Sequence, residues 1–280
     1  MRRAALMLTL AGLLAVVAPA RAQTLPAQVK VQYGSIQEES PLVSEIATVF
    51  PSPTPDAPVV VAVHGGWWGK PRREVEMEKP MQSLQAHGVT VVDINYPITL
   101  PRLATEYGAV ETAVRWAHEH AGEYNGDPAD VQLLGSSAGG ELVSMVADRM
   151  RAPAVTAVIE LSAPGENMVT WVRRLDEGLG PDSGVTPTAT VLECERKLVC
   201  SEDKEREVSA TDHLPSAESC PAWLLAGSEA DLVPLVQEEE MLAAARDAGC
   251  EAQLFVAAKG HAIAYWQKLK PTAIPFIKSH

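Results

Sequence analysis

Basic residues are scarce in this sequence. Its 280 residues include 23 Lys and Arg against 36 Asp and Glu, which gives a formal net charge of −13 at pH 7. Proteins that bind nucleic acid rely on clustered positive charge to neutralise phosphates. The charge balance therefore argues against nucleic acid as a partner and against binding to an anionic membrane surface. An acidic polysaccharide would be an unfavourable substrate for the same reason, unless a local basic patch compensates.

The sequence also lacks the signatures of bound metals and cofactors. Its four Cys and seven His residues form no pair or cluster at metal-ligand spacing, and there is no glycine-rich phosphate loop. We therefore expect a mechanism that uses neither a metal ion nor a cofactor.

The apolar run at the start of the chain is too short for a membrane span, which needs about 20 residues. Residues 1–3 are Met-Arg-Arg, residues 4–17 are apolar, and residues 18–22 end in Ala-Arg-Ala, a small-x-small cleavage pattern. This arrangement predicts a secretory signal peptide over residues 1–22 and an exported protein, periplasmic or extracellular, over residues 23–280. No cysteine follows the run, so a lipid anchor is not indicated.

Cysteine is rare, but its number is even, and an exported chain meets an oxidising environment. Four cysteines allow three pairings. Cys220 and Cys250 each stand immediately before a strand pattern, and neighbouring parallel strands lie about 4.8 Å apart, which suits a disulfide. We favour Cys220–Cys250, which leaves Cys194 and Cys200 to close a small loop.

The most informative motif is Gly-Ser-Ser-Ala-Gly at residues 135–139. A short buried strand pattern at residues 131–134 enters it, and an amphipathic helix pattern at residues 141–150 leaves it. Small residues on both sides let a strand turn sharply into a helix, which exposes the hydroxyl of Ser137 at the carboxyl end of the sheet. Ser137 is therefore the expected nucleophile. The amide of Ala138, at the helix N-terminus, is an expected oxyanion donor.

A second glycine motif follows a buried strand pattern at residues 58–63. It reads His64, Gly65, Gly66, Trp67 and Trp68. Two glycines after a strand let the backbone pass close to a ligand and direct its N–H groups inward. We expect the N–H groups of Gly66 and Trp67 to complete the oxyanion hole, with Gly65 shaping the bend. His64 is expected to brace this loop by hydrogen bonding.

Together these motifs resemble those of the α/β-hydrolases, in the hormone-sensitive-lipase-like branch of esterases. The resemblance rests on the strand before His-Gly-Gly and on the elbow ending in Ser-Ala-Gly-Gly at residues 137–140, and it extends from about residue 59 to residue 261. Trp67 stands where many of these esterases have a third glycine, whereas arylformamidase-like relatives also carry an aromatic residue there.

A serine nucleophile needs a base and an acid, in the order serine, acid, histidine for this family. Asp231 follows a strand pattern at residues 222–226, and His261 follows another at residues 252–257. Parallel strands present their carboxyl ends at one edge of the sheet, so both side chains should lie near Ser137. Glu229 is the competing acid.

The alternation of strand and helix patterns predicts a single α/β domain, with a mostly parallel sheet and helices on both faces. Residues 29–33 and 45–50 are expected to form leading antiparallel strands. Residues 164–219 lose periodicity and are rich in charge, glycine and proline, so we expect a cap insertion. Candidate apolar residues for a substrate pocket under this cap are Met168, Trp171 and Val172.

These features predict an exported serine carboxylesterase that cleaves short-chain acyl esters, either of small molecules or linked to carbohydrate. An amidase of the arylformamidase type is the first alternative, because Trp67 replaces a glycine; the export signal opposes a role in tryptophan catabolism. A non-catalytic binding module on a hydrolase scaffold is the second alternative, because fold alone does not determine function.

Overall fold

The computed structural model describes residues 24–35, 44–70, 74–98, 103–194 and 198–280. The predicted signal peptide, residues 1–22, lies outside the described residues. The described chain forms an eight-stranded sheet with the strand order β1-β2-β4-β3-β5-β6-β7-β8. The strands are β1 (Val29–Gln32), β2 (Ile46–Phe50), β3 (Ala57–Val63), β4 (Thr90–Ile94), β5 (Gly126–Ser136), β6 (Ala157–Leu161), β7 (Ala222–Ser228) and β8 (Ala252–Ala257).

The sheet is antiparallel only at one edge. β1 pairs antiparallel with β2, and β2 pairs antiparallel with β4, whereas all pairings from β4 to β8 are parallel. This confirms the leading antiparallel strands and the mostly parallel sheet that the sequence predicts. Because the strands from β3 to β8 run in one direction, their carboxyl ends meet along one edge of the sheet.

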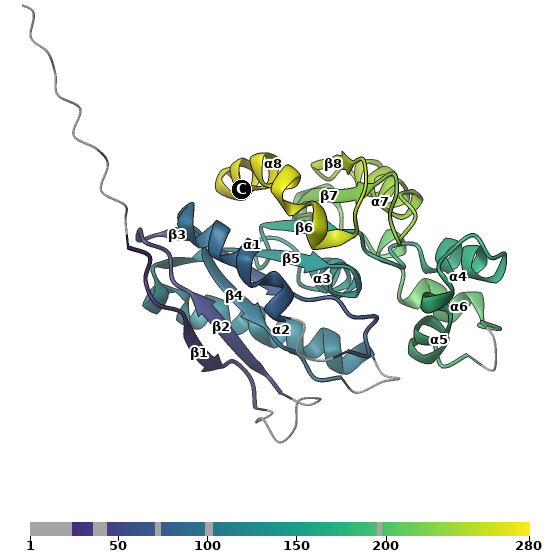
Figure 1. Ribbon diagram of the computed structural model, residues 1–280, viewed down its shortest axis with the longest axis horizontal. Helices are drawn as coiled ribbons and strands as arrows, with labels where there is room; N and C mark the ends of the chain where they lie inside the picture. The colour runs from purple at the N-terminus through teal and green to yellow at the C-terminus, as the bar shows by residue number, and fades with distance from the viewer. Residues whose placement is uncertain (1–23, 36–43, 71–73, 99–102, 195–197) are drawn as a thin grey trace, which may run out of the picture.

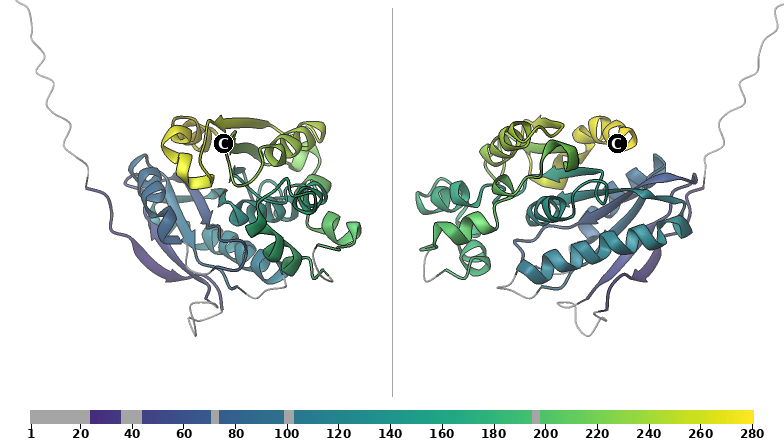
Figure 2. Two further views of the ribbon diagram at one scale, coloured as in Figure 1. Left: turned by 45° about the vertical axis from the view of Figure 1, so that its right-hand side comes forward. Right: turned by 180° about the vertical axis from the view of Figure 1, so that it is seen from behind.

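Helices cover both faces of the sheet. On one face lie α1 (Glu74–Ala86) and α8 (Trp266–Ser279), in front of the sheet in Figure 1. On the other face lie α2 (Leu103–His120), α3 (Ala138–Met150) and α7 (Val236–Asp247); α2 crosses the sheet in the rear view of Figure 2. Each face of the sheet packs against its helices in a separate hydrophobic core. The valines of strand β3 alternate between these two cores, and all are buried, so both faces of the strand need a covering layer of helices.

Residues 164–219 contribute no strand to the described sheet. They contain α4 (Met168–Asp176), α5 (Asp182–Val191), α6 (Glu202–Glu207) and two short 3-10 helices, Ala210–Asp212 and Ala217–Ser219. The three α-helices gather at the right-hand end of the view in Figure 1. A role for this segment as a cap over the site stays a prediction.

Two disulfides join Cys194 to Cys200 and Cys220 to Cys250, with Cα–Cα distances of 4.8 Å and 5.5 Å. These are the pairings that the sequence favours. The second bond links the amino-terminal ends of β7 and β8, which are parallel neighbours. Within the described residues no helix is both long enough and apolar enough to cross a membrane.

Candidate active site

The serine elbow lies between β5 and α3. Ser137 has a φ of 56°, and its amide donates a hydrogen bond of 2.8 Å to the carbonyl oxygen of Leu161. The flanking glycines are required by close backbone approach. A Cβ on Gly135 would lie 2.6 Å from Cα of Gly140, and one on Gly139 would lie 2.8 Å from the carbonyl carbon of Val63. Helix and strand therefore cross too closely here for any side chain.

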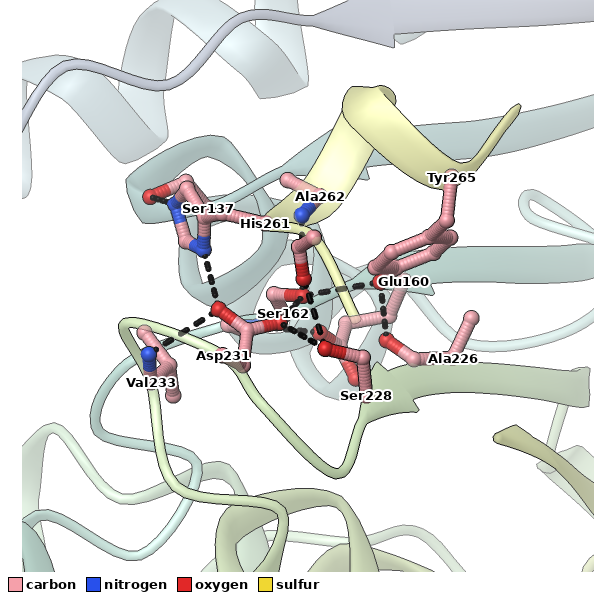
Figure 3. Close-up of polar contacts among 12 residues, drawn as sticks. Ser137, Glu160, Ser162, Ala226, Ser228, Asp231, Val233, His261, Ala262 and Tyr265 are labelled. Atoms are coloured by element: carbon pink, nitrogen blue, oxygen red, sulfur yellow. Dashed lines mark hydrogen bonds and ion pairs between the residues drawn. The ribbon is translucent and has the colours of Figure 1, made fainter. Parts of the chain in front are cut away.

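The structure brings Ser137, His261 and Asp231 into one hydrogen-bonded chain (Figure 3). His261 Nε2 lies 2.9 Å from Ser137 Oγ, and His261 Nδ1 lies 2.6 Å from Asp231 Oδ1. The Asp231 side chain is 1% exposed and that of His261 is 30% exposed. With Asp231 ionised, Nδ1 carries the proton of the neutral ring, so Nε2 is an acceptor for the serine hydroxyl.

The competing acid does not take this place. Glu229 is exposed to solvent, and its backbone amide continues the pairing of β7 with β8 by donating to Ala257. Asp231 lies two residues further on, where the loop has turned toward His261. Its Oδ1 also accepts the amide of Val233 at 3.1 Å.

The glycine loop after β3 passes close to Ser137. A Cβ on Gly65 would lie 2.6 Å from the carbonyl oxygen of Ser136 and 2.8 Å from Cβ of Ser137. Gly66 and Trp67 both have positive φ, 133° and 55°. The loop therefore needs a glycine at residue 65 to approach Ser137 so closely.

Several buried contacts brace this loop. His64 is fully buried, its Nδ1 lies 2.7 Å from the carbonyl oxygen of Gly65, and its ring stacks on Tyr96 at 4.4 Å. Its ring is therefore engaged within the loop and the core. Trp68 Nε1 donates to Glu141 Oε2 at 2.9 Å.

Trp67 connects the loop to the segment 164–219. Its ring stacks on Trp171 of α4, with centroids 6.2 Å apart and an interplanar angle of 29°. A Cβ on Gly184 of α5 would lie 3.1 Å from both indole rings. The glycine loop and the helices of this segment are thus packed against each other through one aromatic contact.

A cavity of about 200 Å³ opens beside Ser137. Its lining residues are Gly65, Gly66, Trp67, Lys70, Glu76, Met77, Ser136, Ser137, Leu232, His261, Ala262 and Ile263. The prediction that Met168, Trp171 and Val172 line the pocket is wrong for this cavity: their side chains are buried in the hydrophobic core, because the inner side of α4 packs inward. Leu232 and Ile263 were missed, although each lies within two residues of Asp231 or His261.

Three further carboxyl groups are buried: Glu160 lies on β6, Glu166 lies between β6 and α4, and Glu238 lies on α7. Burial raises the pKa of all three, and that of Glu160 rises to about 8. With a pKa of about 8, Glu160 stays largely protonated near neutral pH. The carboxyl group that contacts His261 is that of Asp231.

Among the residues that the structure describes, no three His, Cys, Asp or Glu side chains are placed to hold a metal ion. The groups that the structure brings into contact at this site are a serine hydroxyl, an imidazole and a carboxyl group.

Comparisons with known proteins agree with the fold. The family model described as BD-FAE matches residues 49–244. Esterase LipQ of Mycobacterium tuberculosis is 26% identical over 204 residues, which cover 69% of this chain and 47% of LipQ. The chain spans about half the length of the curated relatives it matches.

Two solved structures share the fold. The thermophilic esterase Est2 of Thermogutta terrifontis has a TM-score of 0.67 at 18% identity, covering 90% of this chain and 92% of its own. A truncated carbohydrate esterase from gut microbiota has a TM-score of 0.71 at 18% identity. That match covers 92% of this chain and 97% of the esterase chain.

Proposed function

This chain belongs to the BD-FAE family, in the esterase–lipase branch of the α/β-hydrolases that its sequence resembles, and from that premise we propose that it is a serine carboxylesterase. The observation that carries the proposal is the hydrogen-bonded chain from Ser137 through His261 to Asp231, beside a cavity that can admit an ester. A serine hydroxyl is a weak nucleophile unless a positioned base removes its proton.

In the proposed mechanism, His261 Nε2 takes the proton of Ser137 as Oγ attacks the ester carbonyl carbon. Asp231 stabilises the imidazolium that forms. When the tetrahedral intermediate collapses, the bond from carbon to the alcohol oxygen breaks, and His261 returns the proton to that oxygen. Water then attacks the acyl-enzyme, His261 takes its proton, and the proton returns to Ser137 as the carboxylic acid leaves.

We assign the oxyanion hole to the amides of Gly66, Trp67 and Ala138. Ala138 is the first residue of α3, so its N–H has no acceptor within the helix and lies at the positive end of the helix dipole. The close approach of Gly65 to Ser137 supports assigning the next two amides to the carbonyl oxygen of the bound ester. Negative charge that develops there would be stabilised by donors already in place.

The cavity supports a short acyl group as substrate. Its volume of about 200 Å³ is below the 300–1,000 Å³ or so of pockets for drug-sized ligands. One solved structure of the same fold is a carbohydrate esterase. We therefore propose short acyl esters, with an alcohol that is either a small molecule or a carbohydrate.

Export is part of the proposal. The two disulfides are typical of proteins that mature outside the reducing cytosol, and they agree with the signal peptide predicted over residues 1–22.

An amidase of the arylformamidase type is the second candidate. The observation that favours it is Trp67, an aromatic residue among those that line the cavity, where an aromatic leaving group would bind. The same three residues would cleave a formanilide bond by the same steps.

The test is hydrolysis of p-nitrophenyl acetate, butyrate, octanoate and laurate, with N-formylkynurenine in parallel. Wild type is compared with Ser137→Ala and with Ser183→Ala, a control at an exposed serine of α5 that does not line the cavity. We expect acetate and butyrate to be the best esters, a loss on the order of 10⁴-fold or more in Ser137→Ala, and little change in Ser183→Ala. Preference for the formamide would favour the amidase. No turnover that depends on Ser137, from folded protein, would overturn the proposal and favour the binding module.

A further inference from the structure

The carboxyl end of β6 touches all three loops of the candidate site. β6 lies between β5, which leads to Ser137, and β7, which leads to Asp231. The carbonyl oxygen of Leu161, its last residue, accepts the amide of Ser137. The next residue, Ser162, contacts the loops that carry Asp231 and His261.

Ser162 makes these contacts through one buried hydroxyl (Figure 3). Its Oγ donates to Asp231 Oδ2 at 2.6 Å and accepts the amide of Ala262, the residue after His261, at 3.0 Å. The side chain is fully buried. A single oxygen atom therefore joins the acid loop to the base loop.

The backbone of Ser162 is strained for a residue with a side chain. Its φ is 52°, in the left-handed region, which glycine adopts readily and residues with a side chain adopt at a cost in free energy. Its amide donates to the carbonyl oxygen of Ala226 on β7 at 2.8 Å, which holds the strained residue in place. Strain of this kind persists where the surrounding structure enforces it, and it is concentrated at functional sites.

We propose that Ser162 is a positioning residue, whose hydroxyl holds Asp231 in the orientation that His261 requires. This inference rests on the proposed serine-hydrolase function. It assigns to Ser162 no contact with substrate.

The hydrogen bonds of Asp231 show why this hydroxyl matters. Oδ1 accepts from His261 and from the amide of Val233. Oδ2 has one short contact among the described residues, to Ser162; Ser228 Oγ lies 3.5 Å away and donates its proton to the carbonyl oxygen of Gly260 at 2.6 Å. Loss of the Ser162 hydroxyl would leave half of a buried carboxylate without a close donor.

Tyr265 offers a matched control, because it touches the same hydroxyl without serving Asp231. Its Oη lies 2.8 Å from Ser162 Oγ and donates to the carbonyl oxygen of Ala226 at 2.6 Å. Each hydroxyl has one proton. Ser162 donates its proton to Asp231 Oδ2, and Tyr265 donates its proton to the carbonyl oxygen of Ala226, so no proton lies between the two hydroxyl oxygens. Removal of the Tyr265 hydroxyl therefore leaves the hydrogen bond from Ser162 to Asp231 intact.

The groups that face Asp231 also determine the expected pH profile. Besides His261 they are Glu160 on β6, Glu238 on α7 and Tyr265, whose pKa values burial raises, and all three remain in the variants at Ser162. Without the Ser162 donor the charge on Asp231 is less dispersed, and it stabilises the protonated form of His261 more strongly. The acid limb of kcat/KM against pH should therefore move to higher pH.

The experiment measures kcat, KM and the pH profile on p-nitrophenyl acetate for wild type, Ser162→Ala, Ser162→Gly and Tyr265→Phe. Both Ser162 variants should lose about 10- to 100-fold in kcat, as expected for one hydrogen bond to a charged group, with KM nearly unchanged and the acid limb moved upward. Tyr265→Phe should keep kcat within about threefold and leave the limb in place.

Ser162→Gly keeps the test decisive, because glycine relieves the backbone strain while removing the hydroxyl. Partial unfolding would lower the active fraction but would not move the acid limb. The proposal is overturned if Ser162→Gly retains wild-type kcat and limb, or if Tyr265→Phe loses as much activity as Ser162→Ala. Turnover by wild type that is lost in Ser137→Ala is measured in the same assay, so failure of the proposed function would be seen separately.

Discussion

Replacing Gly65 with alanine should move the glycine loop away from the nucleophile. The added Cβ would lie 2.6 Å from the carbonyl oxygen of Ser136 and 2.8 Å from Cβ of Ser137. Carbon atoms in contact are separated by about 3.5 Å or more, so the loop must shift by roughly 0.7 Å. Ser136 is the last residue of β5 and is held in the sheet, so the displacement falls mainly on residues 65–67.

The amides of Gly66 and Trp67 belong to this loop, so the proposed oxyanion hole moves with it. Misplacement of catalytic groups by about 1 Å can cost on the order of 10²-fold in rate, and loss of one oxyanion donor costs about 10²- to 10³-fold. We expect kcat on p-nitrophenyl acetate to fall on the order of 10²-fold, with a smaller change in KM.

Gly108→Ala is the matched control. Gly108 lies inside α2, and a Cβ there meets nothing within 4 Å. This change should stabilise the protein by about 0.5–1 kcal/mol and leave kcat unchanged. A thermal unfolding curve is first measured on a separate sample of each variant to show that the protein is folded, and kcat is then assayed. A folded Gly65→Ala variant with wild-type kcat would refute the assignment of this loop to the oxyanion hole.

Three further predictions concern pH, packing and covalent links. Burial raises the pKa of Glu141 from 4.5 to about 7. Between these two pH values the folded state binds more protons than the unfolded state, and the free energy of unfolding should fall by about 3 kcal/mol as pH rises from 4.5 to about 7. Denaturant titrations of Glu141→Gln over the same pH range should not show this fall. Trp171→Ala should lower kcat by about tenfold, because Trp67 loses its stacking partner, whereas Trp171→Phe should retain most of it in the same ester assay. Replacing Cys220 and Cys250 together with serine should lower the free energy of unfolding by about 3–4 kcal/mol, because the bond closes a 30-residue loop; the same measurement should give about 2 kcal/mol for the 6-residue separation of Cys194 and Cys200.

The sequence was sufficient to predict elements whose pattern is local. Residues 59–63 are continuously apolar, as a strand buried on both faces must be, and they form β3. The pairing of Cys220 with Cys250 needed one further rule in addition to the local strand patterns, namely that consecutive parallel strands are usually neighbours in the sheet. The contact of Ser137 with His261 needed only the rule that such strands end at one edge.

Features that depend on packing could not be predicted in this way. Ser162 contacts Asp231 only because β6 lies between β5 and β7, and nothing in the residues around it signals that neighbourhood. Periodicity identified Trp171 as apolar, but not whether it faces the cavity or the core. Glu141 and Glu160 are buried although charged residues usually face solvent, because α3 and β6 lie at the centre of the molecule.

The most direct test of the account is covalent labelling of the nucleophile with a fluorophosphonate, followed by intact mass measurement and peptide mapping. A phosphonate reacts only with a serine that a neighbouring base activates and an oxyanion hole supports. We predict one phosphonyl group per chain, on the peptide that contains Ser137, with labelling strongly reduced in His261→Ala. Folded protein that takes no label, or that takes it at another serine, would contradict the assignment of Ser137 as the nucleophile.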